Sequence, residues 1–275
     1  MGKEASNYSF SDDQGSKIYS YILPLLKHPT SNEIKVFEIG CAAGSNLLDF
    51  AENARKQGVE CKLFGTEYEE SLAQIASTKG VEMAKDWALF RNTPVKFDVI
   101  IMSHVLEHFT DPVGSLNAIK SLLEDDGLLY VEVPGLMNQK MMDEWYDSNF
   151  LDYLVHAHTF NFNLSSMKNL VNRAGFRFLK GDEVVRGVFM PNAPHAYLVE
   201  DGVRSNYNDI LTYLENNFVG AAASKCKIGV AKYIYRAVRK FFGQFYYAYI
   251  QTLPDMKGGW NWMSRKSSGE SKVVD

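Results

Sequence analysis

The 275-residue sequence lacks long apolar runs, paired cysteines and a large net charge. No run approaches the roughly 18 apolar residues that a membrane-spanning helix needs, and the N-terminal residues have no apolar segment typical of a signal peptide. The three cysteines, Cys41, Cys61 and Cys226, share no CxxC or metal-ligand spacing, which favours a reducing compartment and argues against structural zinc. A formal net charge of −4 gives no sign of nucleic-acid binding. We therefore expect a cytoplasmic protein with no nucleic-acid partner.

The sequence does contain enough apolar material for a full α/β domain, with 46% hydrophobic and 13% aromatic residues. We expect an N-terminal helical cap over residues 1–30, the α/β domain over residues 31–200, and a helical extension with a disordered tail over residues 201–275. Residues 225–250 include basic but no acidic residues, and their apolar residues recur at helical spacing. This pattern predicts a helix that packs on its own domain or in a homodimer. The alternative is contact with an anionic membrane surface or a lipid-linked acceptor.

A strand that ends in a run of small residues organises the α/β domain. The apolar run Val36–Ile39 leads into the turn Gly40–Ser45, and the residues after it, up to Gln57, have helical spacing. A turn of this kind makes a ligand crevice at the carboxyl end of a parallel strand. Its glycines, Gly40 and Gly44, do not form the Gly-x-Gly-x-x-Gly pattern that receives a pyrophosphate. The loop therefore disfavours a dinucleotide cofactor.

Acidic residues follow the next two predicted strands. Residues 61–66 form the second strand, and Glu67 directly after it is placed to accept both hydroxyl groups of a ribose. A weaker third strand lies within residues 79–87, where Asp86 can bind an adenine amino group and Trp87 can lie on the face of the ring. The alternative for each acid is a solvated position in a loop.

Two further strands are clearer. Phe97–Ser103 is continuously apolar, as buried parallel strands are, and residues 128–134 form a fifth strand after the turn residues Asp125–Gly127. Between these strands, Asp111 can cap a helix that has Pro112 at its first position.

Several of these segments occur in the order and spacing of class I S-adenosylmethionine-dependent methyltransferases. They are Glu38-Ile39-Gly40-x-Ala42-x-Gly44, Glu67, Phe97–Ile100, His104–His108 followed by Asp111-Pro112, and Gly127–Pro134. The sequence most resembles the branch of this family that modifies small molecules and sugars, over about residues 30–200. It departs from the pattern at Ala42, where the family usually has a glycine. We expect a small effect, because a methyl group still lets the backbone lie close to a cofactor.

The resemblance implies a Rossmann-like α/β fold with a seven-stranded sheet of order 3-2-1-4-5-7-6, strand 7 antiparallel and helices on both faces. Residues 176–184 and 196–200 are the candidates for the last two strands. The implied cofactor is S-adenosyl-L-methionine. Its expected contacts lie in the loop and at the strand ends: Glu38, Gly40, Cys41, Ala42, Gly44, Glu67, Asp86, Trp87, Ser103 and His104.

The acceptor is expected beside a second group of residues. Residues 138–154 have the composition of a substrate-side insertion, and His158 stands just before the next predicted helix. In the resembled branch, a histidine at this position often lines the acceptor pocket. We expect catalytic roles for His158, His108 and His156, in that order, because an imidazole with a pKa near neutrality can take the proton of a hydroxyl. Each of them could instead be a structural, hydrogen-bonded histidine.

The predicted function is methyl transfer to a hydroxyl of a small molecule or of a sugar precursor, as in polysaccharide biosynthesis. The alternatives are carbon or nitrogen methylation, and a non-catalytic subunit that binds the cofactor and scaffolds a partner. We expect no metal, because zinc held by Glu107, His156 and His158 would have a spacing unlike recognised ligand patterns.

Overall fold

The structure, a computed structural model, describes residues 13–26, 33–146, 150–154, 157–191 and 203–219. The chain divides into two units, Met1–Ile210 and Leu211–Asp275, and the sheet lies in the first. In the second unit, residues 211–219 are described. The predicted amphipathic helix at residues 225–250 lies outside the described residues.

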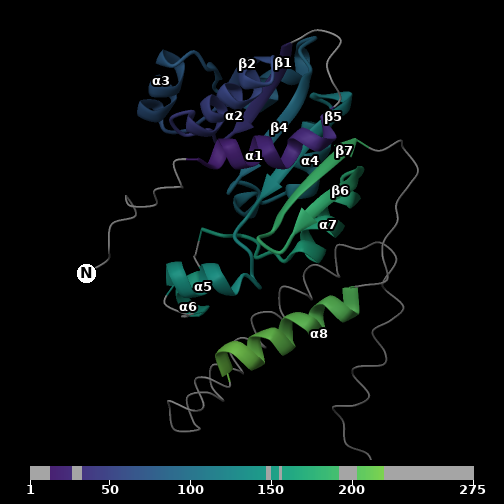
Figure 1. Cartoon of the computed structure of the whole chain (residues 1–275). Helices are drawn as coiled ribbons and strands as arrows, with labels where there is room; N and C mark the ends of the chain where they lie inside the picture. Colours follow the sequence, from purple (N-terminus) through teal and green to yellow (C-terminus); the bar gives the residue numbers. More distant parts are fainter. Residues whose placement is uncertain (1–12, 27–32, 147–149, 155–156, 192–202, 220–275) are drawn as a thin grey trace, which may run out of the picture. The chain divides into compact units, whose positions relative to one another are not determined.

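Seven strands form one sheet in the order β3-β2-β1-β4-β5-β7-β6 (Figure 1). Strands β1 to β5 pair in parallel, and β7 runs antiparallel to both of its neighbours. This topology confirms the predicted Rossmann-like fold class. The strands are β1 Glu33–Ile39, β2 Glu60–Thr66, β3 Glu82–Ala84, β4 Phe97–Ser103, β5 Leu123–Glu132, β6 Phe176–Asp182 and β7 Arg186–Pro191.

Helices cover both faces of the sheet (Figure 1). The α-helices are α1 Gln14–Ile22, α2 Ser45–Lys56, α3 Glu70–Thr78, α4 Pro112–Lys120, α5 Gln139–Tyr146, α6 Phe150–Tyr153, α7 Leu164–Arg173 and α8 Val203–Leu214. Short 3₁₀ turns are η2 Leu23–Leu25, η3 Trp87–Asn92 and η4 Leu106–His108, and η5 Glu215–Val219 is a π-helical turn.

The two faces of the sheet belong to two apolar cores, because alternate residues of a strand point to opposite sides. On one side, Val36 and Ile101 pack with buried residues of α1, α2 and α3. On the other, Phe37 and Met102 pack with buried residues of α4 and α7. Strands that are buried on both sides read as continuous apolar runs, which is why Phe97–Ser103 could be predicted without error.

The predicted turn at residues 125–127 lies inside β5 instead. Phe97 pairs with Leu123, whereas Val99, two residues on, pairs with Leu128, so the extra residues of β5 form a bulge. A Cβ atom at Gly127 would lie only 2.9 Å from the Phe97 carbonyl oxygen, so a glycine is required where the bulge closes against β4. The turn-forming residues Asp125–Gly127 therefore mark a bulge within β5 and not a turn before it.

The prediction for the last strand was wrong. Residues 196–200 lie outside the described residues, and the strand is formed by Arg186–Pro191. It follows β6 through a tight hairpin, closed by a bond from the Val185 amide to the Asp182 carbonyl (3.0 Å) and an ion pair between Arg186 and Asp182 (2.8 Å). The hairpin forms because the run Gly187–Phe189 is apolar enough to be buried against β5.

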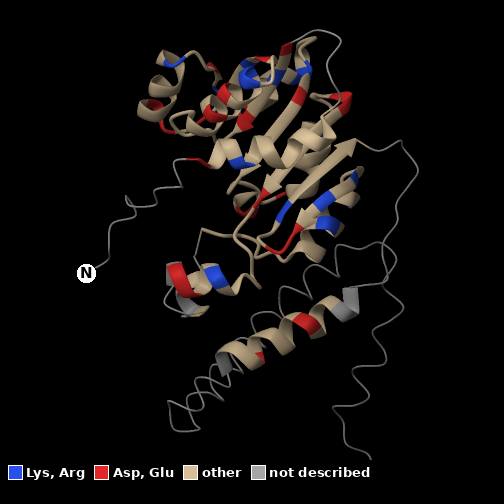
Figure 2. Ribbon diagram, in the orientation of Figure 1, with Lys and Arg blue, Asp and Glu red and all other residues tan. Residues whose placement is uncertain are grey.

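Charged residues lie mainly on the helices and toward the strand ends (Figure 2). The strand centres carry few of them, because they are covered on both sides. Among the described residues, the structure contains no helix whose length and apolar character would suffice to cross a membrane.

Candidate functional site

The small-residue loop after β1 closes over the end of β2. The amides of Gly40 and Cys41 both donate to the Thr66 carbonyl at 2.9 Å, and the Gly44 amide donates to the Cys41 carbonyl at 2.8 Å. Gly40 and Gly44 have φ of +72° and +78°, in the left-handed region that glycine adopts without strain. The loop therefore has one defined conformation at the carboxyl end of the sheet.

Ala42 also lies in the left-handed region, with φ of +45°. Alanine is a small replacement for the family's usual glycine here and was predicted to leave room for a cofactor. The structure adds a second consequence, because a left-handed conformation costs an L-residue roughly 1–2 kcal/mol. The loop holds this strained residue in place through its amide, which donates to Glu67 Oε2 at 3.0 Å.

Glu67 joins the loop to the end of β2. Its Oε2 accepts from the Ala42 amide, and its Oε1 accepts from the Glu69 amide at 2.9 Å. A carboxylate offers about four lone-pair positions, so each oxygen can accept one more bond. The two backbone bonds fix the carboxylate in one orientation, which is what a group that binds two adjacent hydroxyls requires.

Glu38 is buried beneath the same loop, with 1% of its surface exposed. Its Oε1 accepts from the Asn46 side-chain amide at 2.8 Å, while its Oε2 has no hydrogen-bond partner in the described part of the chain. The pKa of this carboxyl is raised to about 8, chiefly by burial; the bond from Asn46 opposes the rise, and the nearby Glu67 adds to it. An acid with an unpartnered oxygen under a ligand loop is suited to a positively charged ligand group.

The segment after β4 contacts the loop after β1. A Cβ atom at Gly40 would lie 2.8 Å from Val105 Cγ2, so the two segments touch. His104 precedes this contact with φ of +55°, and its amide donates to the Glu132 carbonyl at 2.8 Å. Burial and the neighbouring His108 lower the pKa of His104 to about 4, so its ring is neutral at pH 7. Ser103 occupies the last position of β4, paired with Glu132.

Three potential metal-ligating side chains meet beyond His104. One nitrogen or oxygen atom each from Glu107, His108 and His158 lies within 4.8 Å of the others. The rings of His108 and His158 are in edge-to-face contact, with centroids 5.0 Å apart. We call these three residues the acid–histidine cluster. Burial raises the pKa of Glu107 to about 8, and burial together with nearby histidines lowers that of His158 to about 4.

Backbone bonds bring the cluster together across about fifty residues of sequence. The Glu107 carbonyl accepts from the amides of Thr159 (2.8 Å) and Phe160 (3.2 Å). His108 Nδ1 lies 2.9 Å from the Ala157 carbonyl oxygen. The loop that carries His158 is therefore held against the turn that carries Glu107 and His108.

Comparison with known proteins identifies the family. Residues 13–180, more than half of the chain, match the family described as "Methyltransferase domain". The chain belongs to this family. No curated protein sequence matches it.

Methyltransferases are among the solved structures to which this chain is similar. The plantazolicin methyltransferase BpumL, in complex with a triazolic desmethylPZN analog and SAH, is 15% identical with a TM-score of 0.51, and the match covers 68% of this chain and 88% of that chain. An S-adenosylmethionine-dependent methyltransferase from Clostridium acetobutylicum ATCC 824 is 8% identical (TM-score 0.49; coverage 68% and 94%). Magnesium protoporphyrin IX methyltransferase (ChlM) from Synechocystis PCC 6803, with bound SAM, is 11% identical (TM-score 0.46; coverage 70% and 87%).

Three other residues that were predicted to bind the cofactor also have structural roles in the methyltransferase: Cys41, Asp86 and Trp87. The Cys41 side chain is buried, 3.9 Å from the sulfur of Met83, and burial raises its thiol pKa to about 12. Only its backbone can therefore face a ligand. Asp86 caps η3 by accepting from the Ala88 amide at 2.8 Å, and Trp87 packs against the core that contains α4.

The predicted catalytic histidines divide into two groups. His108 and His158 meet in the acid–histidine cluster, whereas His156 lies outside the described residues. Glu107 was named only as a disfavoured zinc ligand, although its place between His104 and His108 was a usable signal. Glu132 was not predicted; it is 8% exposed, and its Oε2 accepts from Tyr130 Oη (2.5 Å) and from the Gln14 side chain (2.7 Å).

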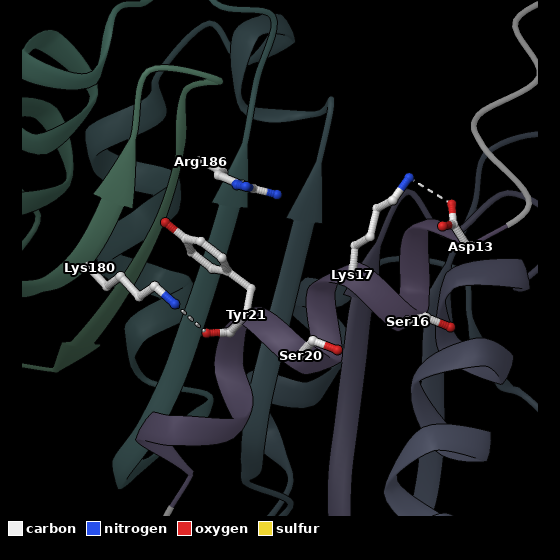
Figure 3. A pocket seen from close by; sticks show the side chains of 7 residues that line it. All are labelled: Asp13, Ser16, Lys17, Ser20, Tyr21, Lys180 and Arg186. Atoms are coloured by element: carbon white, nitrogen blue, oxygen red, sulfur yellow. Dashed lines mark hydrogen bonds and ion pairs between the residues drawn. The ribbon is translucent and has the colours of Figure 1, made fainter.

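A shallow surface hollow of about 450 Å³ lies between α1 and the β6–β7 hairpin (Figure 3). The Lys180 ammonium donates to the Tyr21 carbonyl and lies over the Tyr21 ring, and Lys17 pairs with Asp13. None of the predicted site residues of the methyltransferase lines this hollow, so we do not assign it to the cofactor.

Proposed function

We propose that this methyltransferase transfers a methyl group from S-adenosylmethionine to a hydroxyl oxygen of a small-molecule or sugar acceptor. One observation carries the proposal: the cofactor loop contacts the segment after β4 through Gly40 and Val105, and this segment leads within two residues to the acid–histidine cluster. The loop that we assign to the cofactor and the cluster that we assign to the acceptor hydroxyl therefore lie next to each other at the carboxyl end of one sheet.

The residues of the loop fit the cofactor. Glu67, already oriented by two amides, accepts the two ribose hydroxyls on its remaining lone pairs. Glu38 has one buried oxygen without a partner among the described residues, and we assign it to the positively charged amino-acid end of the cofactor. Asp86 and Trp87 are assigned to the adenine. SAH in the BpumL structures supports the choice of cofactor.

S-adenosylmethionine supplies an electrophilic methyl group on a sulfonium: the acceptor oxygen forms a bond to carbon, the carbon–sulfur bond breaks with its electron pair left on sulfur, and the hydroxyl proton is released. The chain has to align the hydroxyl with the methyl group and exclude water. We assign the alignment to His158 and His108. As a general base, His158 would be weak, because a pKa of about 4 gives little driving force for proton removal at neutral pH. The cluster as a whole is therefore the better candidate for activating the hydroxyl.

Methyl transfer from radiolabelled S-adenosylmethionine tests the proposal, with a panel of hydroxyl, amine and carbon acceptors that includes sugar and polysaccharide precursors. We expect transfer to a hydroxyl, and we expect His158→Asn to lower turnover at least about 10²-fold with unchanged cofactor affinity, because the hydroxyl is no longer held in line with the methyl group. Lys168→Ala, on α7, is the control and should keep the parental rate. Equal turnover of His158→Asn and parent would remove His158 from the site. Cofactor binding without transfer to any acceptor would favour the non-catalytic subunit.

A further inference from the structure

We propose that Glu107, His108 and His158 bind one first-row divalent transition-metal cation, with Zn²⁺ as the preferred ion, and that the acceptor hydroxyl oxygen completes its coordination. The second half of this inference rests on the proposed function. The first half, cation binding by three side chains of this chain, does not.

The first argument is the state of the Glu107 carboxylate. Its side chain is 2% exposed, and neither of its oxygens has a hydrogen-bond partner among the described residues. A buried carboxylate without partners is costly, and such groups are normally paired or bound to a metal. The nearest side-chain nitrogens, His104 Nδ1 and His108 Nε2, each lie 3.8 Å from Oε1, which is too far for a hydrogen bond.

The second argument is the orientation of the His108 ring. Its Nδ1 lies 2.9 Å from the Ala157 carbonyl oxygen, and a carbonyl can only accept, so Nδ1 carries the proton. In this tautomer Nε2 keeps its lone pair, and Nε2 lies 3.8 Å from Glu107 Oε1. Metal-binding histidines almost always donate their other N–H to a carbonyl or carboxylate in this way.

The third argument is the rigidity of the cluster. The Glu107 carbonyl holds the amides of Thr159 and Phe160, so the loop that carries His158 is fixed beside the other two ligands. The three ligand atoms lie within 4.8 Å of one another. Around a tetrahedral zinc ion, with bonds of about 2.0–2.2 Å, ligand atoms lie about 3.3–3.5 Å apart. We expect the two imidazole rings to rotate when a cation binds, and so to close this difference.

The ligand set selects the kind of cation. Two imidazole nitrogens and one carboxylate are typical of zinc sites that keep a position open for substrate, and they also suit cobalt or iron. Mg²⁺ prefers oxygen ligands in octahedral geometry, so we expect it to bind much more weakly. In the open position, a hydroxyl oxygen would lose its proton near neutral pH, since a bound cation lowers the pKa of its oxygen ligand. The proton goes to solvent, and the oxygen lone pair becomes available for the methyl group.

Direct metal binding tests the inference on the full-length, tag-free chain. The chain is first treated with a chelator and then titrated with Zn²⁺, Co²⁺ or Mg²⁺ by calorimetry. We expect one Zn²⁺ or Co²⁺ per chain, and a visible spectrum of the Co²⁺ form without the charge-transfer band of cysteine ligands. Glu107→Gln and His158→Asn should bind at least about 10²-fold more weakly, whereas Glu82→Gln, at an exposed carboxylate on β3, should bind as the parent does.

The result that overturns the inference is a parent chain that binds no cation at about 100 μM, or Glu107→Gln and His158→Asn variants that bind as tightly as the control. Cofactor affinity and methyl transfer are measured on the same samples. If the chelated chain methylates its acceptor at the parental rate, the second half of the inference, coordination of the acceptor hydroxyl, fails and the proposed function stands. If one cation binds at the cluster but no acceptor is methylated, the cation site stands and the proposed function fails.

Discussion

Replacing Glu38 with glutamine should change how the stability of the cofactor-free protein depends on pH. The folded-state pKa of Glu38 is raised to about 8, chiefly by burial, from an ordinary value of 4.5. A raised carboxyl pKa means that the folded state holds a proton which the unfolded state has lost. The contribution of Glu38 to the free energy of unfolding therefore has its full value below about pH 4.5 and falls as the pH rises toward 8.

The magnitude follows from the difference between the two pKa values. Each pH unit between them changes the free energy of unfolding by about 1.4 kcal/mol. Between pH 4.5 and pH 7 the ionisation of Glu38 in the unfolded state therefore lowers the free energy of unfolding by about 3 kcal/mol. This is a large part of the roughly 5–15 kcal/mol that stabilises a typical domain. Glutamine keeps a carbonyl oxygen that can accept from Asn46 Nδ2, so the variant loses the ionisable group but not this hydrogen bond.

Urea unfolding of parent and Glu38→Gln, without cofactor, at pH 5 and pH 7.5 measures the effect. Between these two pH values, the free energy of unfolding of the parent should fall by about 3 kcal/mol more than that of the variant. Glu107 and Glu132 also have raised pKa values, but they are present in both proteins and cancel in the comparison. Parallel pH profiles would refute the reasoning, because they would mean that Glu38 is ionised in the folded state.

Two further predictions concern the same loop. Ala42→Gly should raise the free energy of unfolding by about 0.5–1 kcal/mol. Glycine relieves the strained φ of +45°, and the greater conformational entropy of glycine in the unfolded chain cancels only part of this gain. A lower denaturation midpoint would contradict this. Glu67→Ala should weaken S-adenosylmethionine binding at least about tenfold, by loss of two hydrogen bonds to a charged group. In calorimetry, Glu70→Gln serves as the control, and an affinity for Glu67→Ala equal to the parent's would exclude Glu67 from the site.

The loop after β1 and its contact with Glu67 could be predicted because each of their parts is local in sequence. A buried parallel strand is a continuous apolar run, and the ligand loop follows it directly, as in Val36–Ile39 and Gly40–Gly44. The bond from the Ala42 amide to Glu67 spans two strands, but both residues stand directly after strand ends. Parallel pairing then brings them together without further information.

The acceptor half could not be predicted in the same way. His156 and His158 were grouped with Glu107 by residue type, but the structure pairs Glu107 and His158 with His108. What unites them is the Glu107 carbonyl, which accepts two amides from residues about fifty positions away. A backbone carbonyl has no signature in the sequence, so only the folded chain reveals this contact.

The missed hairpin has a related physical cause. Turns between strands are usually marked by glycine, asparagine or proline, whereas residues 183–185 have none of these. Val185, a β-branched residue, has φ of +64° and is fully buried. Because a β-branched residue rarely adopts this conformation, no turn is predicted here, and the predicted strand runs on to residue 184, whereas β6 ends at Asp182.

Backbone strain collects at one edge of the sheet. Among the described residues, the non-glycine residues with positive φ are Ala42, His104 and Val185. Ala42 lies in the cofactor loop, His104 donates to the carbonyl of the last residue of β5, and the Val185 carbonyl accepts from Val133 just beyond that strand. Such strain persists only where the surrounding structure fixes it, as the two packed faces of the sheet do here. The same edge carries the loop after β1 and leads to the acid–histidine cluster, so the strained residues gather where the loops at the carboxyl ends of the parallel strands meet.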